Sequence, residues 1–246
     1  MSLPVHLVPS LADASAGVVV TVEGDEAHHA VAVRRLRVGE AVVLTDGLGT
    51  TARGVVASTA RRVFEVTVSS LSSAPAPEPS VVVVQALPKG DRGELAVEML
   101  TEVGVSSIVP WAAARCVAVW RGERAAKSLA RWRSTAREAA KQARRSWFPA
   151  VEELASTSDA AALLGSVDLA VVLHEDASLP LTSVEVPATG LLAVVVGPEG
   201  GLTDDEVAAF AAAGATPVRL GAEVLRTSTA GVAAVSALLS RTERWR

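Results

Sequence analysis

The spacing of hydrophobic positions differs between the two parts of this chain. Before residue 69, short runs rich in Val and Thr are separated by turn signals such as Asp46-Gly47 and Gly49. Closely spaced runs of this kind are typical of antiparallel strands, and they predict a small β-barrel or sandwich. The strands are expected at residues 18–22, 41–45, 51–57 and 63–68.

From residue 81 onward, continuous Val, Leu and Ala runs alternate with longer helical patterns. Runs that are apolar on both faces and interleaved with helices indicate a buried parallel sheet, so this part is predicted to be an α/β domain. Its strands are expected at 81–86, 107–111, 169–173, 191–196 and 216–220. Its helices are expected near 91–103, 122–145, 158–164, 204–214 and 228–241.

A polar segment separates the two parts. Residues 69–80, SSLSSAPAPEPS, contain three prolines and five serines, a composition typical of a linker. The predicted division is therefore a β domain at 1–72, a linker at 73–80 and an α/β domain at 81–246.

Composition excludes several classes of protein. With 50% hydrophobic and 20% charged residues in 246, the chain can bury one large core or two smaller ones. No apolar run approaches the roughly 20 residues of a membrane span, and the first ten residues do not resemble a secretory signal. A single cysteine, Cys116, cannot form an internal disulfide, so we expect a soluble protein of the cytoplasm. The four histidines and this cysteine show no metal-ligand spacing, and no partner histidine marks Cys116 as a nucleophile.

The charges are segregated along the chain. Residues 121–145 hold nine basic and two acidic residues, a net of +7, whereas the whole chain carries −4, so the remainder carries −11. A smaller basic cluster, Arg34, Arg35 and Arg37, follows His28 and His29. Such patches attract a phosphate backbone even in an acidic protein, although a charged helix face can also simply be solvated. Because only 3% of residues are aromatic and none is Tyr, base stacking on an aromatic platform is not expected.

The long basic segment has a helical apolar stripe at Leu129, Trp132, Ala136, Ala140 and Ala143. A row of cations at intervals of four runs beside that stripe, so it is expected at the edge of the buried face, where it can point into a cleft. The row consists of Arg133, Arg137, Lys141 and Arg145.

Two loops are the strongest candidates for chemistry. The first, GPEGGL at 197–202, follows a predicted strand and precedes Thr203 and Glu206, which form a capping-box pattern. Loops at the carboxyl ends of parallel strands bind ligands in α/β proteins. A carboxylate at Glu199 without a nearby lysine argues against phosphate and fits ribose hydroxyls or a cationic ligand. The alternative is a plain strand-to-helix turn.

The second loop, RLGAEVLRTSTAG at 219–231, again follows a strand. Its backbone amides and hydroxyls can hold an uncharged heterocycle by its edge. Alternatively, Arg226 pairs with a carboxylate at a helix start, and Thr227 is an ordinary N-cap. His174 ends a strand at the same sheet edge and either lines this site or caps the strand.

The two loops together, GPEGGLTDDE and LGAEVLRTSTA, resemble those of the RsmE-type 16S rRNA uridine N3-methyltransferases, members of the SPOUT class that uses S-adenosylmethionine (SAM). Residues 28–49 are similar to the PUA-like RNA-binding domain of that family, and residues 87–111 to the opening of its catalytic domain. Three positions depart from the family pattern, which usually has Glu at Lys141, Lys at Met99 and an acid at Ser228.

The resemblance implies a trefoil knot in the α/β domain, a homodimer with the active site at its interface, and SAM as methyl donor without a metal. The expected substrate is N3 of uridine 1498 of 16S rRNA, in the usual rRNA numbering, within the small ribosomal subunit. Arg226 and then Arg145 are the implied catalytic residues, with no general base assigned. The implied SAM-binding residues are His174, Gly197, Glu199, Gly200, Leu220, Gly221, Leu225, Thr227 and Thr229. The implied RNA-binding residues are Arg34, Arg35, Arg37, Arg133, Arg137 and Lys141.

The sequence leaves two alternative functions open and excludes a third. Another SPOUT enzyme, such as a ribose 2′-O-methyltransferase of tRNA or rRNA, would share the SAM loops. A non-catalytic rRNA-binding or assembly protein would keep the basic patches but not the SAM site. A nicotinamide-dependent dehydrogenase is excluded because no G-x-G-x-x-G follows an early strand.

Overall fold

The computed structural model describes residues 3–246, which form two compact units. The N-terminal unit extends to Ala76 and also includes Lys141–Phe148, whereas the C-terminal unit comprises Pro77–Ala140 and Pro149–Arg246. Each unit has its own apolar core.

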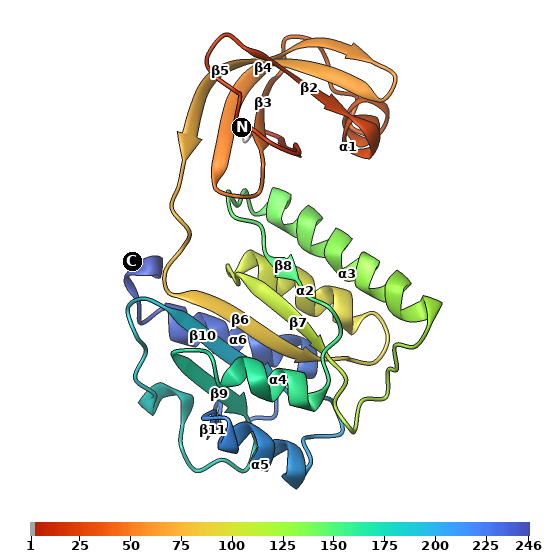
Figure 1. The fold of residues 1–246 in the computed structure, drawn as a ribbon. Helices are drawn as coiled ribbons and strands as arrows, with labels where there is room; N and C mark the ends of the chain where they lie inside the picture. The colour runs from red at the N-terminus through yellow and green to blue at the C-terminus, as the bar shows by residue number, and fades with distance from the viewer. Residues whose placement is uncertain (1–2) are drawn as a thin grey trace. The chain divides into compact units, whose positions relative to one another are not determined.

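A curved five-stranded sheet forms the N-terminal unit (Figure 1). Its order is β1-β3-β4-β5-β2, with β1 parallel to β3 and every other pair antiparallel. The four predicted strands are confirmed, and β1 was missed because three residues carry too little pattern. The strands are β1 (Val5–Leu7), β2 (Val19–Glu23), β3 (Ala41–Thr45), β4 (Thr50–Ala60) and β5 (Val63–Ser73).

Two helical turns, α1 (Gly24–His28) and the π-helical η1 (His29–Val33), follow β2. Their small residues Ala27 and Ala30 are fully buried beside Phe64 and the inward-facing valines of the strands. Alternating burial along β4 and β5 explains why the period-two pattern was readable in the sequence.

The predicted linker starts too early. Strand β5 continues to Ser73 and pairs with β4 as far as Thr50↔Ser73, beyond a register shift between Arg53 and Gly54. Serines can occupy such a pair because its stability comes from backbone hydrogen bonds and the side chains stay exposed. The stretch between strands therefore shortens to residues 74–79, since β6 begins at Ser80.

The segment 141–148 joins the N-terminal unit, although the sequence division left it in the α/β domain. Phe148 N–H donates to the Gly47 carbonyl at 2.9 Å, and Trp147 Nε1 donates to Ala74 O at 2.9 Å. At Gly49, with φ +103°, a Cβ atom would lie 2.7 Å from the Trp147 ring, so only glycine fits. Contacts over such a sequence separation leave no local pattern to read.

A six-stranded, wholly parallel sheet forms the C-terminal unit, in the order β11-β9-β10-β6-β7-β8. The parallel α/β prediction is confirmed, and only the two-residue β8 was missed. The strands are β6 (Ser80–Ala86), β7 (Ser107–Trp111), β8 (Ala150–Val151), β9 (Leu169–Leu173), β10 (Leu191–Val196) and β11 (Thr216–Val218).

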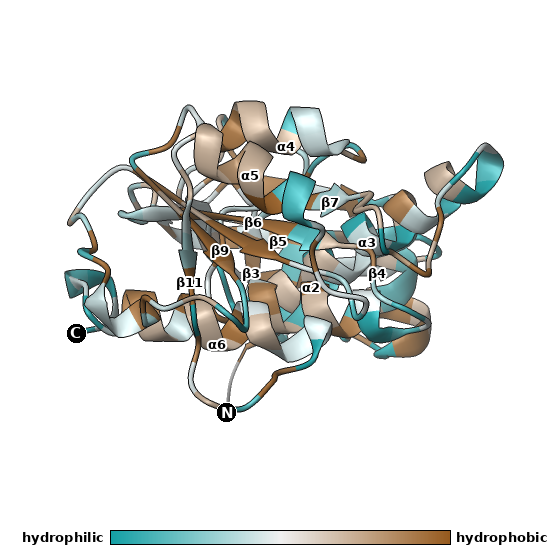
Figure 2. Ribbon diagram, turned by 90° about the horizontal axis from the view of Figure 1, so that it is seen from below, coloured by the Kyte–Doolittle hydropathy of each residue, from teal (hydrophilic) through white to brown (hydrophobic). Residues whose placement is uncertain are grey.

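Helices cover both faces of this sheet (Figure 2). One core cluster joins the sheet to α2 (Arg92–Glu102), α3 (Glu123–Gln142) and α6 (Thr227–Leu239). The other joins it to α4 (Thr157–Leu164) and α5 (Asp204–Ala212), where Phe210 contacts Trp111 edge-on. Short 3-10 turns, η2 (Leu181–Ser183) and η3 (Glu243–Trp245), complete the unit.

The predicted basic helix ends earlier than expected. Leu129, Trp132, Ala136 and Ala140 are buried as the stripe requires, but α3 stops at Gln142. Arg144 then adopts a left-handed backbone with φ +55°. Arg145 therefore does not continue the cation row of Arg133, Arg137 and Lys141, and that part of the prediction is wrong.

Candidate functional site

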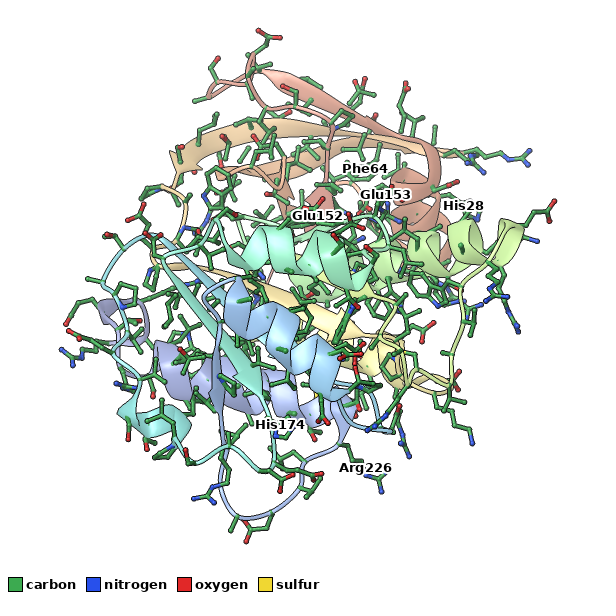
Figure 3. The ribbon with its side chains drawn as sticks, turned by 60° about the horizontal axis from the view of Figure 1, so that its bottom comes forward. His28, Phe64, Glu152, Glu153, His174 and Arg226 are labelled. Atoms are coloured by element: carbon green, nitrogen blue, oxygen red, sulfur yellow. The ribbon has the colours of Figure 1, made fainter. Side chains whose placement is uncertain are left out.

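A cavity of about 630 Å³ opens at the carboxyl ends of β9, β10 and β11, wholly within the C-terminal unit. Both loops singled out in the sequence line it, together with the turn after β9. His174 and Arg226 lie toward this end of the unit (Figure 3). Its volume is in the range typical of small-molecule sites.

Glu206 fixes the first loop. Thr203 and Glu206 form the predicted capping box, with Glu206 N–H donating to Thr203 Oγ1 at 3.2 Å and Thr203 N–H donating to Glu206 Oε2 at 2.9 Å. The other oxygen of this buried carboxylate accepts from Ala114 N–H at 2.7 Å. The cap therefore also ties the loop to the segment after β7.

Arg115, in the turn that follows β7, supports the same loop. Its NH1 donates to the carbonyls of Gly200 at 3.3 Å and Leu202 at 3.1 Å. A Cβ atom at Gly200 would approach Arg115 Cβ to 3.0 Å, so a glycine permits this close packing. Arg115 also lines the cavity. The resemblance to the family includes Arg115 and Cys116, but the sequence argument gave Arg115 no role in the site.

Gln85 anchors the second loop from beneath. It is the one polar residue in the buried run of β6, and its Nε2 donates to Thr227 O at 3.3 Å and to Ala86 O at 3.1 Å. Two carbonyl acceptors fix the orientation of the amide, because its oxygen would be repelled there. An amide within a run of valines was the available signal for this residue.

The remaining backbone of the second loop is held by β9 and the chain that follows it. Arg219 N–H donates to Leu179 O at 2.8 Å, and Leu181 N–H donates to Arg219 O at 2.9 Å. His174 N–H donates to Val218 O at 2.9 Å. Gly221 then turns the chain with φ +80°.

Most of the expected cofactor residues line this cavity. They are His174, Gly197, Glu199, Gly200, Leu220, Gly221, Leu225 and Thr227. Thr229 does not line it and instead donates its hydroxyl to Arg226 O at 3.2 Å, in the first turn of α6.

Arg226 lines the cavity and is the N-cap residue of α6, without a side-chain cap, so Thr227 is the first helical residue. Within residues 3–246 no carboxylate pairs with Arg226. The alternatives of a paired helix-start arginine and a Thr227 N-cap are therefore wrong.

Glu199 lines the cavity but already has partners in the loop between β6 and α2. Its Oε1 accepts from Lys89 N–H at 3.2 Å and lies 3.7 Å from Arg92 NH1. The carboxylate is thus directed at this loop.

Carboxylates outnumber guanidinium groups around the cavity. The acidic lining residues are Glu175, Asp176, Glu199, Asp204 and Glu223, and the basic ones are Arg115, Arg219 and Arg226. A net negative lining favours a ligand with positive charge.

The three cations of the predicted row that lie on α3 have partners within the chain. Arg133 donates to Val151 O at 3.0 Å and pairs with Glu153 at 2.9 Å, and Arg137 pairs with Glu138 at 3.6 Å. Lys141 Nζ lies 2.9 Å from Glu26 Oε2, with only 10% of its side chain exposed. Lys141 thus neutralises a buried carboxylate instead of facing solvent.

The predicted basic cluster of the N-terminal unit is exposed. Arg34, Arg35 and Arg37 surround Leu36, which is buried in the core and anchors the turn. His28 and His29 belong to the preceding helical turns. Arg145 lies in the segment 141–148 of this unit and does not line the cavity.

The family of RNA methyltransferase domains matches residues 75–239, and that of RNA methyltransferase PUA domains matches residues 22–69. The chain belongs to the RNA methyltransferase family. It is 46% identical to ribosomal RNA small subunit methyltransferase E of Mycobacterium bovis over 93% of this chain and 89% of the relative. The enzyme of the same name from Bacillus subtilis is 30% identical, over 91% and 90% of the two chains.

A solved structure of this family has the same fold. Ribosomal RNA small subunit methyltransferase E of Neisseria gonorrhoeae, bound to SAM, superposes with a TM-score of 0.86 at 27% identity, over 97% of this chain and 98% of that one. The resemblance drawn from the two loops is therefore confirmed.

Among residues 3–246, no helix combines the length and apolar character needed to cross a membrane. No group of three or more His, Cys, Asp and Glu side chains in that range could hold a metal ion. Burial raises the pKa of the Cys116 thiol, which argues against a thiolate nucleophile.

Proposed function

We propose that this protein is a SAM-dependent methyltransferase that methylates N3 of uridine 1498 of 16S rRNA in the small ribosomal subunit. The observation that carries the proposal is the cavity between the two loops at the carboxyl edge of the sheet, in a chain of the RNA methyltransferase family. The proposal includes the homodimer, the trefoil knot and the cytoplasmic location implied by the resemblance.

The residues present fit SAM. The sulfonium and ammonium of SAM outnumber its carboxylate, so its net positive charge complements the acidic lining. Gly197, Gly200 and Gly221 leave backbone amides and carbonyls accessible to an adenine edge and a ribose. SAM supplies a methyl group that is electrophilic because it is bonded to a sulfonium.

The chain must position the acceptor uracil, and the proton on its N3 must be removed before the methyl group is transferred. Uracil N3 carries a proton at neutral pH, and its removal leaves a negative charge delocalised over the ring. Arg226, at the cavity and without a carboxylate partner among the described residues, would stabilise that charge. In-line approach of N3 to the methyl group depends on how rigidly Gln85, Arg115 and Glu206 hold the loops.

Substrate binding draws on the two basic regions. In the N-terminal unit, Arg34, Arg35 and Arg37 would bind rRNA phosphates. Arg133 and Arg137 are half-exposed and would add contacts through α3, whereas Lys141 is committed to Glu26.

The test is transfer of labelled methyl from SAM to small ribosomal subunits that lack this modification, followed by digestion and chromatography of the nucleosides. Label in 3-methyluridine is expected. Label in a ribose-methylated nucleoside would indicate the related enzyme class instead. Absence of transfer despite SAM binding would indicate a different substrate or a binding protein without catalysis.

A further inference from the structure

The loop between β6 and α2 borders the cavity and carries two cations that the proposed function has not used. Glu199, a lining residue, accepts from Lys89 N–H at 3.2 Å and lies 3.7 Å from Arg92 NH1. Strands β6 and β10 are neighbours in the parallel sheet, so the loops that follow them emerge at the same edge. The Lys89–Arg92 loop is therefore part of the rim of the site.

Both cations can take another anion. The Arg92 side chain is 42% exposed, and a guanidinium has five N–H donors, so the 3.7 Å contact of NH1 with Glu199 leaves donors for another anion. Lys89 is exposed, and its side chain makes no ion pair within residues 3–246. The Arg92–Glu199 pair uses only part of the guanidinium, so Arg92 can bind a phosphate while it stays beside Glu199.

A cation of the basic helix α3 lies close to the start of α2. Arg131 NH1 lies 3.2 Å from Glu94 Oε1, two residues after Arg92 in the first turn of α2. Arg131 is 68% exposed. Arg131 of α3 thus reaches the first turn of α2, where it pairs with Glu94 close to Arg92 in the sequence.

Electrostatics supplies the reason for such a rim. The cavity lining has an excess of carboxylates, which favours a cationic cofactor but repels the phosphates of an RNA whose base must enter. Arg92 places a positive charge 3.7 Å from Glu199, a lining carboxylate that contacts this loop, and offers the donor geometry that suits a phosphate.

We propose that Arg92 and Lys89 bind the RNA phosphates that flank the target nucleotide, and that Glu199 acts as a positioning residue that holds Arg92 at the rim. Glu199 then serves the RNA side of the site and does not bind the ribose of SAM. The inference rests on the proposed function, and it names the element of that site that receives the RNA backbone.

The first test is Arg92→Ala in the full-length protein, with Arg246→Ala as matched control. Arg246 also pairs with a neighbouring glutamate in an exposed position, at Glu243. It lies at the opposite edge of the sheet, since Arg244 beside it donates to carbonyls of Pro79 and Gly104, which precede β6 and β7.

For Arg92→Ala we expect the KM for small subunits to rise about tenfold, with kcat and the Kd of SAM within about twofold of wild type. The slope of log K for subunit binding against log salt should fall by about one. Arg246→Ala should leave all of these unchanged.

Glu199→Gln tests the positioning role. The glutamine keeps an acceptor for Lys89 N–H but loses the charge that attracts Arg92. We expect a higher KM for subunits with unchanged Kd for SAM, whereas a ribose contact would weaken SAM binding.

The double variant Arg92→Ala/Glu199→Gln distinguishes a direct contact of Arg92 with phosphate from mere screening of the Glu199 charge by Arg92. If Arg92 binds phosphate, the double variant stays as weak as Arg92→Ala. If Arg92 only screens Glu199, subunit binding recovers and the inference is overturned.

The inference is also overturned if Arg92→Ala has an unchanged KM for subunits while the wild type is active. It is likewise overturned if either single variant loses affinity for SAM together with affinity for subunits. An inactive wild type would instead refute the proposed function, and filter binding of subunits would still report on Arg92.

Discussion

At the scale of single residues, Arg226 is the group on which the chemistry depends most directly. It lines the cavity from the start of α6 and has no carboxylate partner in the described chain. Replacing it with alanine should lower kcat at least about 100-fold, the usual effect of removing one donor from a developing anion, while SAM affinity stays within a few-fold. Initial rates and calorimetric titration with SAM measure the two effects. Near-normal turnover would refute this role.

A second residue-scale prediction concerns Glu26 in the N-terminal unit. Burial acts to raise the pKa of this carboxyl, but hydrogen bonds from His6 at 3.1 Å and Lys141 at 2.9 Å, with the charges of both, outweigh burial and lower it below 4.5. The unfolded state therefore binds the proton more readily, so the stabilisation is present above pH 4.5 and is lost as the pH falls through the folded pKa.

Glu26→Gln should thus destabilise the protein at pH 7 by about 2 to 3 kcal/mol, because it removes the carboxylate charge that pairs with the largely buried Lys141 ammonium. The variant should also lose part of the stability change below pH 4.5. Calorimetric unfolding of the full chain at pH 7 and pH 4 measures both. Asp25→Asn is the control, since the Asp25–Arg62 pair is exposed and should contribute little; an equal effect of the two variants would contradict the prediction.

At the scale of elements, two helices begin with the same device and allow a matched comparison. Thr203–Glu206 caps α5 beside the cavity, and Ser156–Asp159 caps α4. Thr203→Ala and Ser156→Ala should each cost about 1 kcal/mol of stability. Only Thr203→Ala should also weaken SAM binding, because its cap orients the loop that lines the cavity. Thermal unfolding and SAM titration of both variants test this, and equal SAM affinities would contradict it.

At the scale of the whole molecule, the cofactor cavity and the exposed arginine cluster belong to different compact units with separate cores. Replacing Arg34, Arg35 and Arg37 together with alanine should weaken binding to small subunits and reduce its salt dependence. The Kd of SAM should not change. Filter binding at several salt concentrations, with SAM titration alongside, measures this; unchanged subunit binding would disprove the role of the cluster.

The elements with strong periodicity were predictable from the sequence. The runs that became β7, β9 and β10 have the predicted bounds because strands buried on both faces must be continuously apolar. The capping box of α5 was equally local, since it needs only a threonine and a glutamate three positions apart. Both loops of the site followed from the placement of these elements.

Tertiary structure decided which side chains meet. Helix α3 ends at Gln142, close to two contacts between residues that are distant in sequence. These are the ion pair of Lys141 with Glu26 and the packing of Trp147 against Gly49. The same holds for Arg115 and Gln85 beneath the loops and for Glu199 beside Arg92. Periodicity reports only whether a position is buried, whereas the partner of a charged or polar group depends on how separate elements pack. The sequence alone therefore determined the family, the elements and the site loops, and the fold determined what each polar side chain in them does.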